Sequence, residues 1–217
     1  MSRRKVVVWR HGQTAFNAER RYQGHLDVEL DGVGRAQAAR AARLLAGLSP
    51  SAIVSSDLVR ARATADELAR LTGLDVTTDK RLREIDVGAW QGLSFDEVAQ
   101  RFPDEVAQWR DGREGRRGGG ETLVEVAERA VEALHAVLAS IPDGETLVVV
   151  THGAAGRAVV ASMIGLPAPM WAALGSLANC NWSVIGEVDP GSVGMAGWRL
   201  LEHNAGTLPE PAVGDDR

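Results

Sequence analysis

The sequence contains very little lysine and almost no cysteine. Lys5 and Lys80 are its only lysines, so arginine supplies nearly all of the 24 basic residues. An arginine-rich composition suits bidentate binding of phosphate or carboxylate groups, although a GC-rich genome produces the same bias. Cys180 is the single cysteine, which excludes an internal disulfide and makes a cytoplasmic location the default expectation.

Long apolar runs are also missing. No stretch approaches the length of a membrane span, and only four apolar residues follow the basic start at 1–5, so we expect neither a signal peptide nor a membrane partner. The net charge of -5 gives no overall electrostatic support for a nucleic-acid partner. A His-x-x-x-His pair, a cysteine cluster and an aspartate-rich loop are absent too, so we expect no metal and no cofactor.

What is present is a chain of ordinary globular composition. Its 217 residues, 45% of them hydrophobic, suit one domain with a single large core, which we assign to 1–205. The tail at 206–217 is rich in proline and glycine, and we expect it to be disordered. Apolar runs and helical patterns alternate along the chain, which predicts a three-layer α/β/α sandwich with a mostly parallel central sheet.

Capping residues and breakers give the expected boundaries. Expected strands cover 6–9, 52–55, 75–78 and 147–151, with a closing antiparallel pair at 181–188 and 198–203. Expected helices run from 31 to 47, from about 57 to 73, from 122 to 141, from 154 to 164 and from 169 to 177, with one short helix after Ser94.

Two of the valine-rich strands end in histidine followed by glycine, at His11-Gly12 and at His152-Gly153. Short apolar runs of this kind are typical of buried parallel strands, whose carboxyl ends meet in one crevice where ligands bind. We therefore expect the two imidazoles to face each other, so that one attacks a substrate and the other stabilises charge or moves protons. A lone histidine at a strand end is more often structural, but two such pairs favour a functional site.

Further residues predict an anion site in the same crevice. Arg10 precedes His11, Asn17 lies in the following loop, and Arg60 lies early in the helix after the second strand. Gly153 begins a helix whose free backbone N–H groups and dipole favour negative charge. Together these groups predict a pocket for a dianion such as a phosphoryl group.

Cleavage of a phosphoester also needs a proton donor. Glu84, in the loop after the third strand, is the best candidate, because a phosphoryl dianion and apolar neighbours would keep its carboxyl group protonated. Asp86 is the alternative in the same loop. His25 and His203 could be structural or could contribute to the site. The three glycines at 118–120 favour a flexible helix entry over a phosphate cradle.

Four segments occur in a specific order along the chain. They are Arg10-His11-Gly12-Gln13-Thr14 with Asn17, Ser55-Ser56-Asp57-Leu58-x-Arg60-Ala61-x-x-Thr64, Arg83-Glu84 with Gly88-x-Trp90-x-Gly92, and Thr151-His152-Gly153. In this order they resemble the histidine phosphatase superfamily, which has the phosphoglycerate mutase-like fold. The resemblance extends from Val6 to about Asn204.

The resemblance implies a covalent mechanism. By it, His11 is the nucleophile and becomes a phosphohistidine, and Glu84 protonates the leaving oxygen. The phosphoryl group is held by four residues, namely Arg10, Asn17, Arg60 and His152. Water then hydrolyses the phosphohistidine without a metal, which splits one difficult displacement into two easier ones.

The segment after the acid favours a phosphatase over a mutase. Mutases of the superfamily usually carry Tyr-Gly-x-Leu-x-Gly followed by a lysine, whereas residues 87–94 here contain Gly88-Ala89-Trp90 and no lysine. A phosphoglycerate mutase remains the first alternative, and a non-catalytic phosphate-binding module is the second.

A closer resemblance concerns the substrate. Tyr22-Gln23-Gly24 and the segments 171–182 and 197–200 resemble the actinobacterial glucosyl-3-phosphoglycerate phosphatases. The resemblance makes this small phosphorylated metabolite the expected substrate and Gln23 a contact to its glycerate part. Related members act as dimers, so a homodimer is a candidate assembly for this chain.

Overall fold

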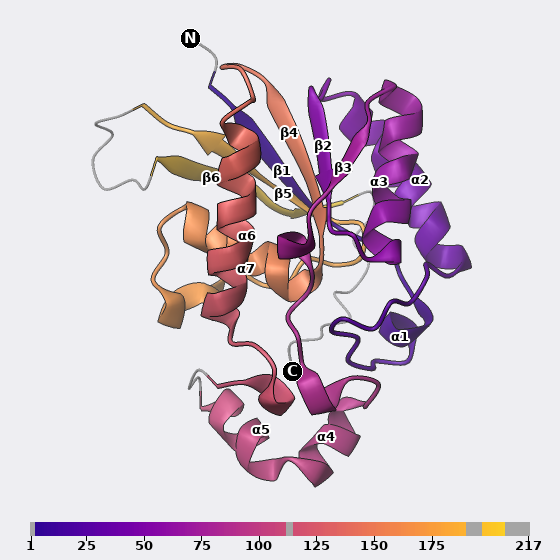
Figure 1. Ribbon diagram of the computed structural model, residues 1–217, viewed down its shortest axis with the longest axis vertical. Coiled ribbons are helices and arrows are strands. Elements are labelled where there is room, and N and C mark those ends of the chain that lie inside the picture. The colour runs from indigo at the N-terminus through magenta and orange to yellow at the C-terminus, as the bar shows by residue number, and fades with distance from the viewer. Residues whose placement is uncertain (1–2, 112–114, 190–196, 207–217) are drawn as a thin grey trace.

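A six-stranded sheet forms the centre of the computed structural model, which describes residues 3–111, 115–189 and 197–206 (Figure 1). Across the sheet the strands are β3 (Val76–Thr78), β2 (Ala52–Ser55), β4 (Thr146–Thr151), β1 (Lys5–Arg10), β5 (Trp182–Glu187) and β6 (Trp198–Ala205). The first four strands are parallel, and β5 and β6 are antiparallel to their neighbours. The mostly parallel sheet and its closing antiparallel pair are therefore confirmed.

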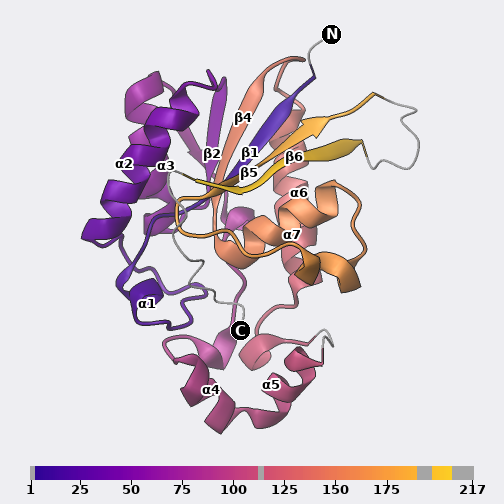
Figure 2. The same cartoon turned by 180° about the vertical axis from the view of Figure 1, so that it is seen from behind.

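Helices cover both faces of this sheet (Figures 1 and 2). On one face lie α2 (Gly32–Ala46) and α3 (Val59–Thr72), and on the other lie α6 (Leu123–Leu138) and α7 (Gly153–Met163). The side chains of β1 alternate between the two cores. Val6 and Val8 pack with α6 and α7, whereas Val7 and Trp9 pack with α2 and α3. A strand covered on both faces must be apolar throughout, and the predicted three-layer sandwich is confirmed.

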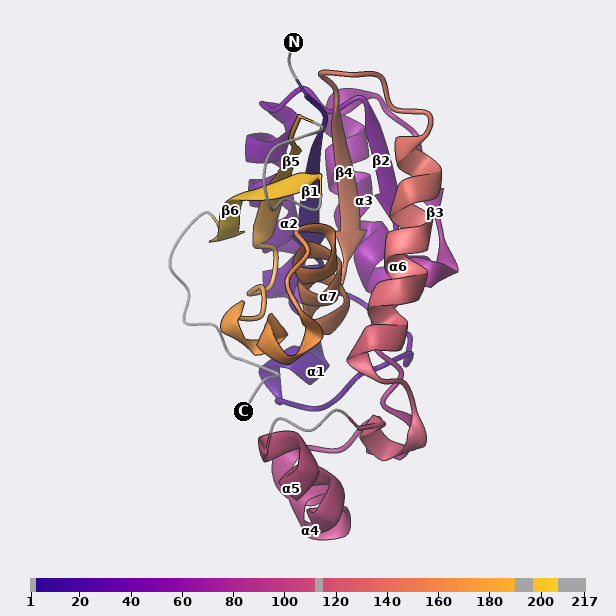
Figure 3. The same cartoon turned by 90° about the vertical axis from the view of Figure 1, so that its left-hand side faces the viewer.

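A smaller helical segment packs beyond the carboxyl ends of the parallel strands (Figure 3). It contains α4 (Phe95–Arg101) and α5 (Pro103–Arg110), where the sequence predicted a single short helix. Proline disfavours helical conformation in the residue before it but suits the first turn of a new helix, so Pro103 ends one helix and begins the next. A third apolar cluster, which includes Trp90 and Val98, holds this segment on the rest of the domain.

Some other predicted boundaries differ from the structure. The helix expected at 169–177 is a 3₁₀ segment, Ala168–Ala173, because the chain leaves the helical region at Leu174 and Leu177 packs into the core. The predicted polar loop after β1 contains the four-residue helix α1 (Ala15–Ala18). The tail predicted to be disordered lies outside the described residues apart from Gly206. The assignment of 1–205 to one domain stays a prediction.

No helix within the described residues is long and apolar enough to cross a membrane.

The loop after β1 lies directly on the start of α2. A Cβ built on Gly34 would overlap the backbone of Gln13, and one built on Gly12 would overlap the carbonyl of Gly34. Asp31 caps the helix by accepting a hydrogen bond from the Gly34 N–H at 2.7 Å, and it also accepts one from the Gln13 side chain at 3.0 Å. The helix therefore fixes the backbone that follows His11.

We expect Gly34→Ala to lower the free energy of unfolding by about 1–3 kcal/mol, because the added methyl group meets rigid backbone rather than a movable side chain. Gly32→Ala in the same helix is the matched control. No atom lies within 4 Å of its added Cβ, so it should be neutral or stabilising by up to ~1 kcal/mol. Urea unfolding of both variants measures the difference, and equal stabilities would contradict the close approach.

Candidate active site

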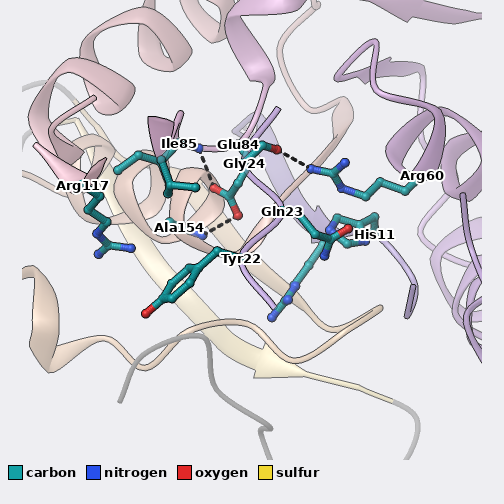
Figure 4. A pocket seen from close by; sticks show the side chains of 11 residues that line it. His11, Tyr22, Gln23, Gly24, Arg60, Glu84, Ile85, Arg117 and Ala154 are labelled. Atoms are coloured by element: carbon teal, nitrogen blue, oxygen red, sulfur yellow. Dashed lines mark hydrogen bonds between the residues drawn. The ribbon is translucent and has the colours of Figure 1, made fainter. Parts of the chain in front are cut away.

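A pocket with an empty volume of about 430 Å³ brings together most of the predicted site residues (Figure 4). Its lining consists of Arg10, His11, Tyr22, Gln23, Gly24, Arg60, Glu84, Ile85, Val87, Arg117 and Ala154. Three predicted residues, Asn17, His152 and Gly153, are not part of this lining. All three are buried, and His152 and Gly153 contact the lining residues His11 and Arg10.

The parallel pairing of β1 with β4 juxtaposes the two histidines. Arg10 is the register partner of Thr151, and the N–H of His11 donates to the carbonyl of Thr151 at 3.0 Å. The imidazole of His11 consequently lies edge-on to that of His152, with ring centroids 5.1 Å apart. The expectation that the imidazoles face each other is met, and both are almost completely buried.

The hydrogen bonding of His11 determines its tautomer. Its Nδ1 lies 2.7 Å from the carbonyl oxygen of Gly12, and because a carbonyl only accepts, Nδ1 carries the proton. Burial, reinforced by the positive charges of Arg60 and Arg10, holds the pKa of His11 well below its ordinary value. The imidazole is therefore neutral at neutral pH, and Nε2 bears an available electron pair.

His152 is held by a residue to which the sequence analysis gave no role. Its Nε2 lies 2.9 Å from the hydroxyl oxygen of Ser56, and its Nδ1 has no hydrogen-bond partner in the described part of the chain. Burial lowers the pKa of His152 well below its usual value, and the charge of Arg60 lowers it further. The site thus contains two neutral imidazoles beside cationic arginines.

Backbone carbonyls orient the two arginines of the predicted phosphoryl site. Arg10 donates from Nη1 to the carbonyl of Leu177 at 2.6 Å. Arg60 donates to the carbonyls of Leu26 and Gly24 at 2.7 and 2.9 Å. Gly153 packs against the Arg10 guanidinium, since a Cβ at this position would lie 3.3 Å from it. The glycine lets the guanidinium lie at the N-terminus of α7.

Glu84 occupies part of the helix end that was expected to be open to a phosphoryl group. Its carboxylate accepts hydrogen bonds from the backbone N–H groups of Ala154 and Ala155 at 3.2 and 3.0 Å, and from that of Ile85 at 2.9 Å. The expectation that the first N–H groups of this helix are free is therefore wrong for Ala154 and Ala155. The positive end of a helix favours any anion, and the nearest one is this carboxylate.

The backbone of Glu84 is fixed as firmly as its side chain. Its carbonyl accepts from Arg129 at 2.9 Å and lies 2.8 Å from Nε2 of His25. Arg129 also pairs with Glu121 at 2.7 Å. His25 therefore contacts the backbone of the loop that carries Glu84, although it does not itself line the pocket. Arg129 escaped the sequence analysis because nothing in its helical pattern marks it as inward-facing.

The two remaining candidates lie outside the pocket lining. The side chain of Asp86, the alternative acid, accepts a hydrogen bond from the N–H of Gly88 at 2.8 Å. This bond stabilises the turn of the loop that contains both residues. His203 lies between the hydroxyl of Ser183 and the carbonyl of Gly175, at 2.9 and 2.8 Å. The geometry therefore favours Glu84 over Asp86 and gives His203 a structural contact.

Both predicted amide contacts have their oxygens engaged within the protein. Asn17 accepts from the Thr14 N–H at 3.1 Å and from Asn179 at 3.2 Å, and Gln23 accepts from the Thr14 hydroxyl at 3.0 Å. Within the described residues neither amide nitrogen donates a hydrogen bond to the protein. Only Gln23 lines the pocket, where its amide N–H groups suit an oxygen-rich ligand.

Arg117 also lines the pocket, although the sequence analysis did not select it. It lies directly before the three glycines at 118–120 that were interpreted as a helix entry. A charged residue directly before a run of glycines was the sequence signal that could have marked Arg117 as a site residue.

Comparisons with known proteins identify relatives along nearly the whole chain. The model of the histidine phosphatase superfamily (branch 1) matches residues 6–201. A glucosyl-3-phosphoglycerate phosphatase from Mycolicibacterium vanbaalenii is 39% identical over 213 residues, covering 93% of this chain and 95% of that protein. A probable phosphoglycerate mutase from Salmonella choleraesuis is 38% identical over 186 residues, covering 83% and 84%. The solved structure of a mycobacterial glucosyl-3-phosphoglycerate phosphatase with inorganic phosphate is 38% identical, has a TM-score of 0.83, and covers 94% of this chain and 98% of that chain.

The two buried histidines predict a loss of stability on acidification. Their pKa values are lowered in the folded state, so below about pH 6.5 the unfolded chain binds protons that the folded chain does not, and stability falls as the pH falls. Each histidine contributes a slope of up to about 1.4 kcal/mol per pH unit. His152→Gln should therefore show a smaller loss than the wild type between pH 7 and pH 5.5 in urea unfolding.

His135→Gln, at an exposed position of α6, controls for the substitution itself. Identical pH slopes for His152→Gln and the wild type would contradict the inferred neutral state of His152.

Proposed function

Since the chain belongs to the histidine phosphatase superfamily (branch 1), we propose that it hydrolyses phosphomonoesters through a phosphohistidine on His11, with no metal required. The observation that carries this proposal is the buried pair of His11 and His152, which shares one site with Arg10, Arg60 and Glu84. Each of these groups is assigned to a step of the proposed reaction.

His11 is the nucleophile of the first step. Its Nδ1 proton is held by the Gly12 carbonyl, so the electron pair on Nε2 attacks phosphorus as the bond to the leaving oxygen breaks. The phosphorylated ring carries a positive charge, which the same carbonyl stabilises. The low pKa of His11 keeps the ring neutral before attack, so no proton has to leave first.

Arg10, Arg60 and His152 stabilise the transferring phosphoryl group. The carbonyls of Leu177 and Gly24 hold the two guanidinium groups in place, so their charges need not reorganise as the transition state forms. His152 lies edge-on to His11 and would add a hydrogen-bonding ring for the phosphoryl oxygens.

Glu84 moves the protons of both steps. In the first step its carboxyl group gives a proton to the leaving oxygen. In the second step its carboxylate takes a proton from water, whose oxygen attacks phosphorus as the bond to Nε2 breaks. Neutral His11 and inorganic phosphate result, and Glu84 is protonated again for the next turnover.

Variants of Glu84 and His11 should differ in how their rate of hydrolysis depends on the leaving group. We expect Glu84→Gln to slow hydrolysis of alkyl phosphoesters far more than that of p-nitrophenyl phosphate, whose leaving group needs little protonation. His11→Ala should lose activity on both by about 10³-fold or more. Phosphate release is measured in the presence of EDTA. Near-wild-type turnover by His11→Ala, or equal losses for Glu84→Gln on both substrates, would overturn the assigned roles.

For the substrate, we propose glucosyl-3-phosphoglycerate. Support comes from the 39% identity to a phosphatase named for this compound and from the polar side chains of Tyr22 and Gln23 in the pocket lining. Gln23 is oriented by Thr14 so that its N–H groups can donate to hydroxyl or carboxylate oxygens of the glycerate part.

Gln23→Ala should lower kcat/KM for glucosyl-3-phosphoglycerate by about 5- to 100-fold, which corresponds to one lost contact of roughly 1–3 kcal/mol. The kcat/KM for p-nitrophenyl phosphate, which has no glycerate part, should stay unchanged. Gln100→Ala, at an exposed position of α4, is the matched control. A wild-type preference for simple phosphoesters over this substrate would refute the specific proposal and leave the general one.

The similarity to a probable phosphoglycerate mutase makes phosphoryl transfer the second candidate. A mutase needs a bisphosphate primer and interconverts phosphoglycerates, whereas the proposed phosphatase releases free phosphate without a primer. The same substrate panel, assayed with and without a primer, separates these two activities.

A further inference from the structure

Ser56, the residue that follows β2, is completely buried beside His152. In the parallel pair of β2 and β4, Ser55 is the register partner of Val150, and the N–H of Ser56 donates to the Val150 carbonyl at 2.9 Å. The backbone of Ser56 is thereby tied to the strand that His152 follows, and its Oγ lies 2.9 Å from Nε2 of His152. The steps assigned to the other site residues leave this buried hydroxyl unused.

The hydrogen bonding of the Ser56 hydroxyl is almost completely specified. A hydroxyl group has one hydrogen to donate and two lone pairs with which to accept. Oγ accepts from the N–H of Leu58 at 3.3 Å, so this contact takes up a lone pair and not the hydrogen. Among the described residues, Nε2 of His152 is the one partner that can accept the hydrogen.

This constraint distinguishes the two tautomers of the neutral His152 ring. If Nε2 carried the proton, it would donate to Oγ, and the Ser56 hydrogen would be left buried without an acceptor. If Nδ1 carries the proton, Nε2 accepts the Ser56 hydrogen and the bond is satisfied from both sides. Nδ1 has no partner among the described residues in either case. The tautomer with the proton on Nδ1 therefore leaves fewer buried polar groups unsatisfied, and it is favoured.

The N–H that remains on Nδ1 suits a phosphoryl group. The ring of His152 lies 5.1 Å from that of His11, and Arg60 and Arg10 are near enough for their charges to lower its pKa. A phosphoryl group transferred to His11 would thus bring oxygen atoms next to His152. The oxygens of a phosphoryl dianion only accept hydrogen bonds, so they attract an N–H and are repelled by a bare lone pair.

We propose that Ser56 is a positioning residue, whose hydroxyl donates to Nε2 of His152 and keeps the proton of this imidazole on Nδ1, where it bonds to the transferring phosphoryl group. This inference rests on the proposed phosphatase function. The Gly12 carbonyl makes His11 present a lone pair, whereas the Ser56 hydroxyl makes His152 present an N–H. Two neighbouring imidazoles in the same tautomer consequently have opposite tasks, and neither has to exchange a proton before the transition state forms.

The tautomer is measured directly by NMR of the full chain labelled with ¹⁵N in its histidines. Couplings between the ring carbon-bound protons and the two nitrogens show which nitrogen carries the proton, and His152→Gln identifies the His152 signals among those of the five histidines. Near neutral pH we expect wild-type His152 to be protonated on Nδ1 alone. Saturating inorganic phosphate should shift this Nδ1–H signal without changing the tautomer. Ser56→Ala should move the proton partly or wholly to Nε2.

Kinetics separate Ser56 from the proton donor. Ser56→Ala should lower kcat/KM by about 10- to 100-fold, less than the roughly 10²- to 10³-fold that loss of a transition-state donor itself costs. The loss should be the same for p-nitrophenyl phosphate and for alkyl phosphoesters, because the donor acts on the phosphoryl group that both share. Glu84→Gln, in contrast, should distinguish the two substrates.

Ser183→Ala is the matched control. Ser183 is also completely buried, and its Oγ lies 2.9 Å from a histidine nitrogen, Nδ1 of His203, which is not part of the pocket lining. This variant loses the same kind of bond, and its kcat/KM should stay within about twofold of the wild type.

Several results would overturn the proposal. They are a wild-type His152 protonated on Nε2, an Nδ1–H signal that does not respond to inorganic phosphate, and equal kinetic losses for Ser56→Ala and Ser183→Ala, which would indicate a structural role. The wild-type spectra decide the matter even if Ser56→Ala does not fold. Failure of the phosphatase function is seen separately, as absence of p-nitrophenyl phosphate hydrolysis by the wild type, and the spectra need no turnover.

Discussion

The parallel pairing of β1 with β4 is the interaction on which the rest of the site depends. It places Arg10 opposite Thr151, so the residues that follow the two strands, His11 and His152, leave the sheet side by side. Both strands are covered by helices on both faces, and their ends are consequently shielded from water. That shielding keeps the imidazoles neutral, because a buried cation next to two guanidinium groups would be strongly disfavoured. The neutral state of the two imidazoles is therefore a result of the packing around them as much as of the residue type.

The start of α7 combines structural and electrostatic roles. Its first N–H groups hold the Glu84 carboxylate, and its initial glycine makes room for the guanidinium of Arg10. A carboxylate and a guanidinium, groups of opposite charge, are thus brought to one helix end. The loop that carries Glu84 and the strand that ends at Arg10 are separate elements, and both contact this helix end.

Much of this arrangement could be predicted from the sequence, because it depends on local patterns. Valine-rich runs that end in His-Gly indicate parallel strands, and the order of the strands places their ends together. The position of Arg117 in the pocket lining could not be predicted in this way, since it depends on the docking of the 3₁₀ turn Arg117–Gly119 against a loop some thirty residues earlier in the chain. Glu84 as the partner of the α7 N-terminus was missed for the same reason. Local sequence patterns predict where a helix begins, but they do not predict which side chain from a distant part of the chain binds to that helix end.

The α4–α5 segment packs in the third apolar cluster, which includes Trp90 and Val98, while Arg10 ends, and the two histidines follow, strands packed in the two main cores. The two parts of the pocket wall are consequently supported by largely separate sets of buried side chains. Substitutions among the α4 and α5 members of the smaller cluster can reshape the outer end of the pocket without touching the valine-rich strands. Selection can therefore change which alcohol is released without changing how the bond to phosphorus is broken. A scaffold built in this way is suited to diversify by substrate while it keeps one reaction.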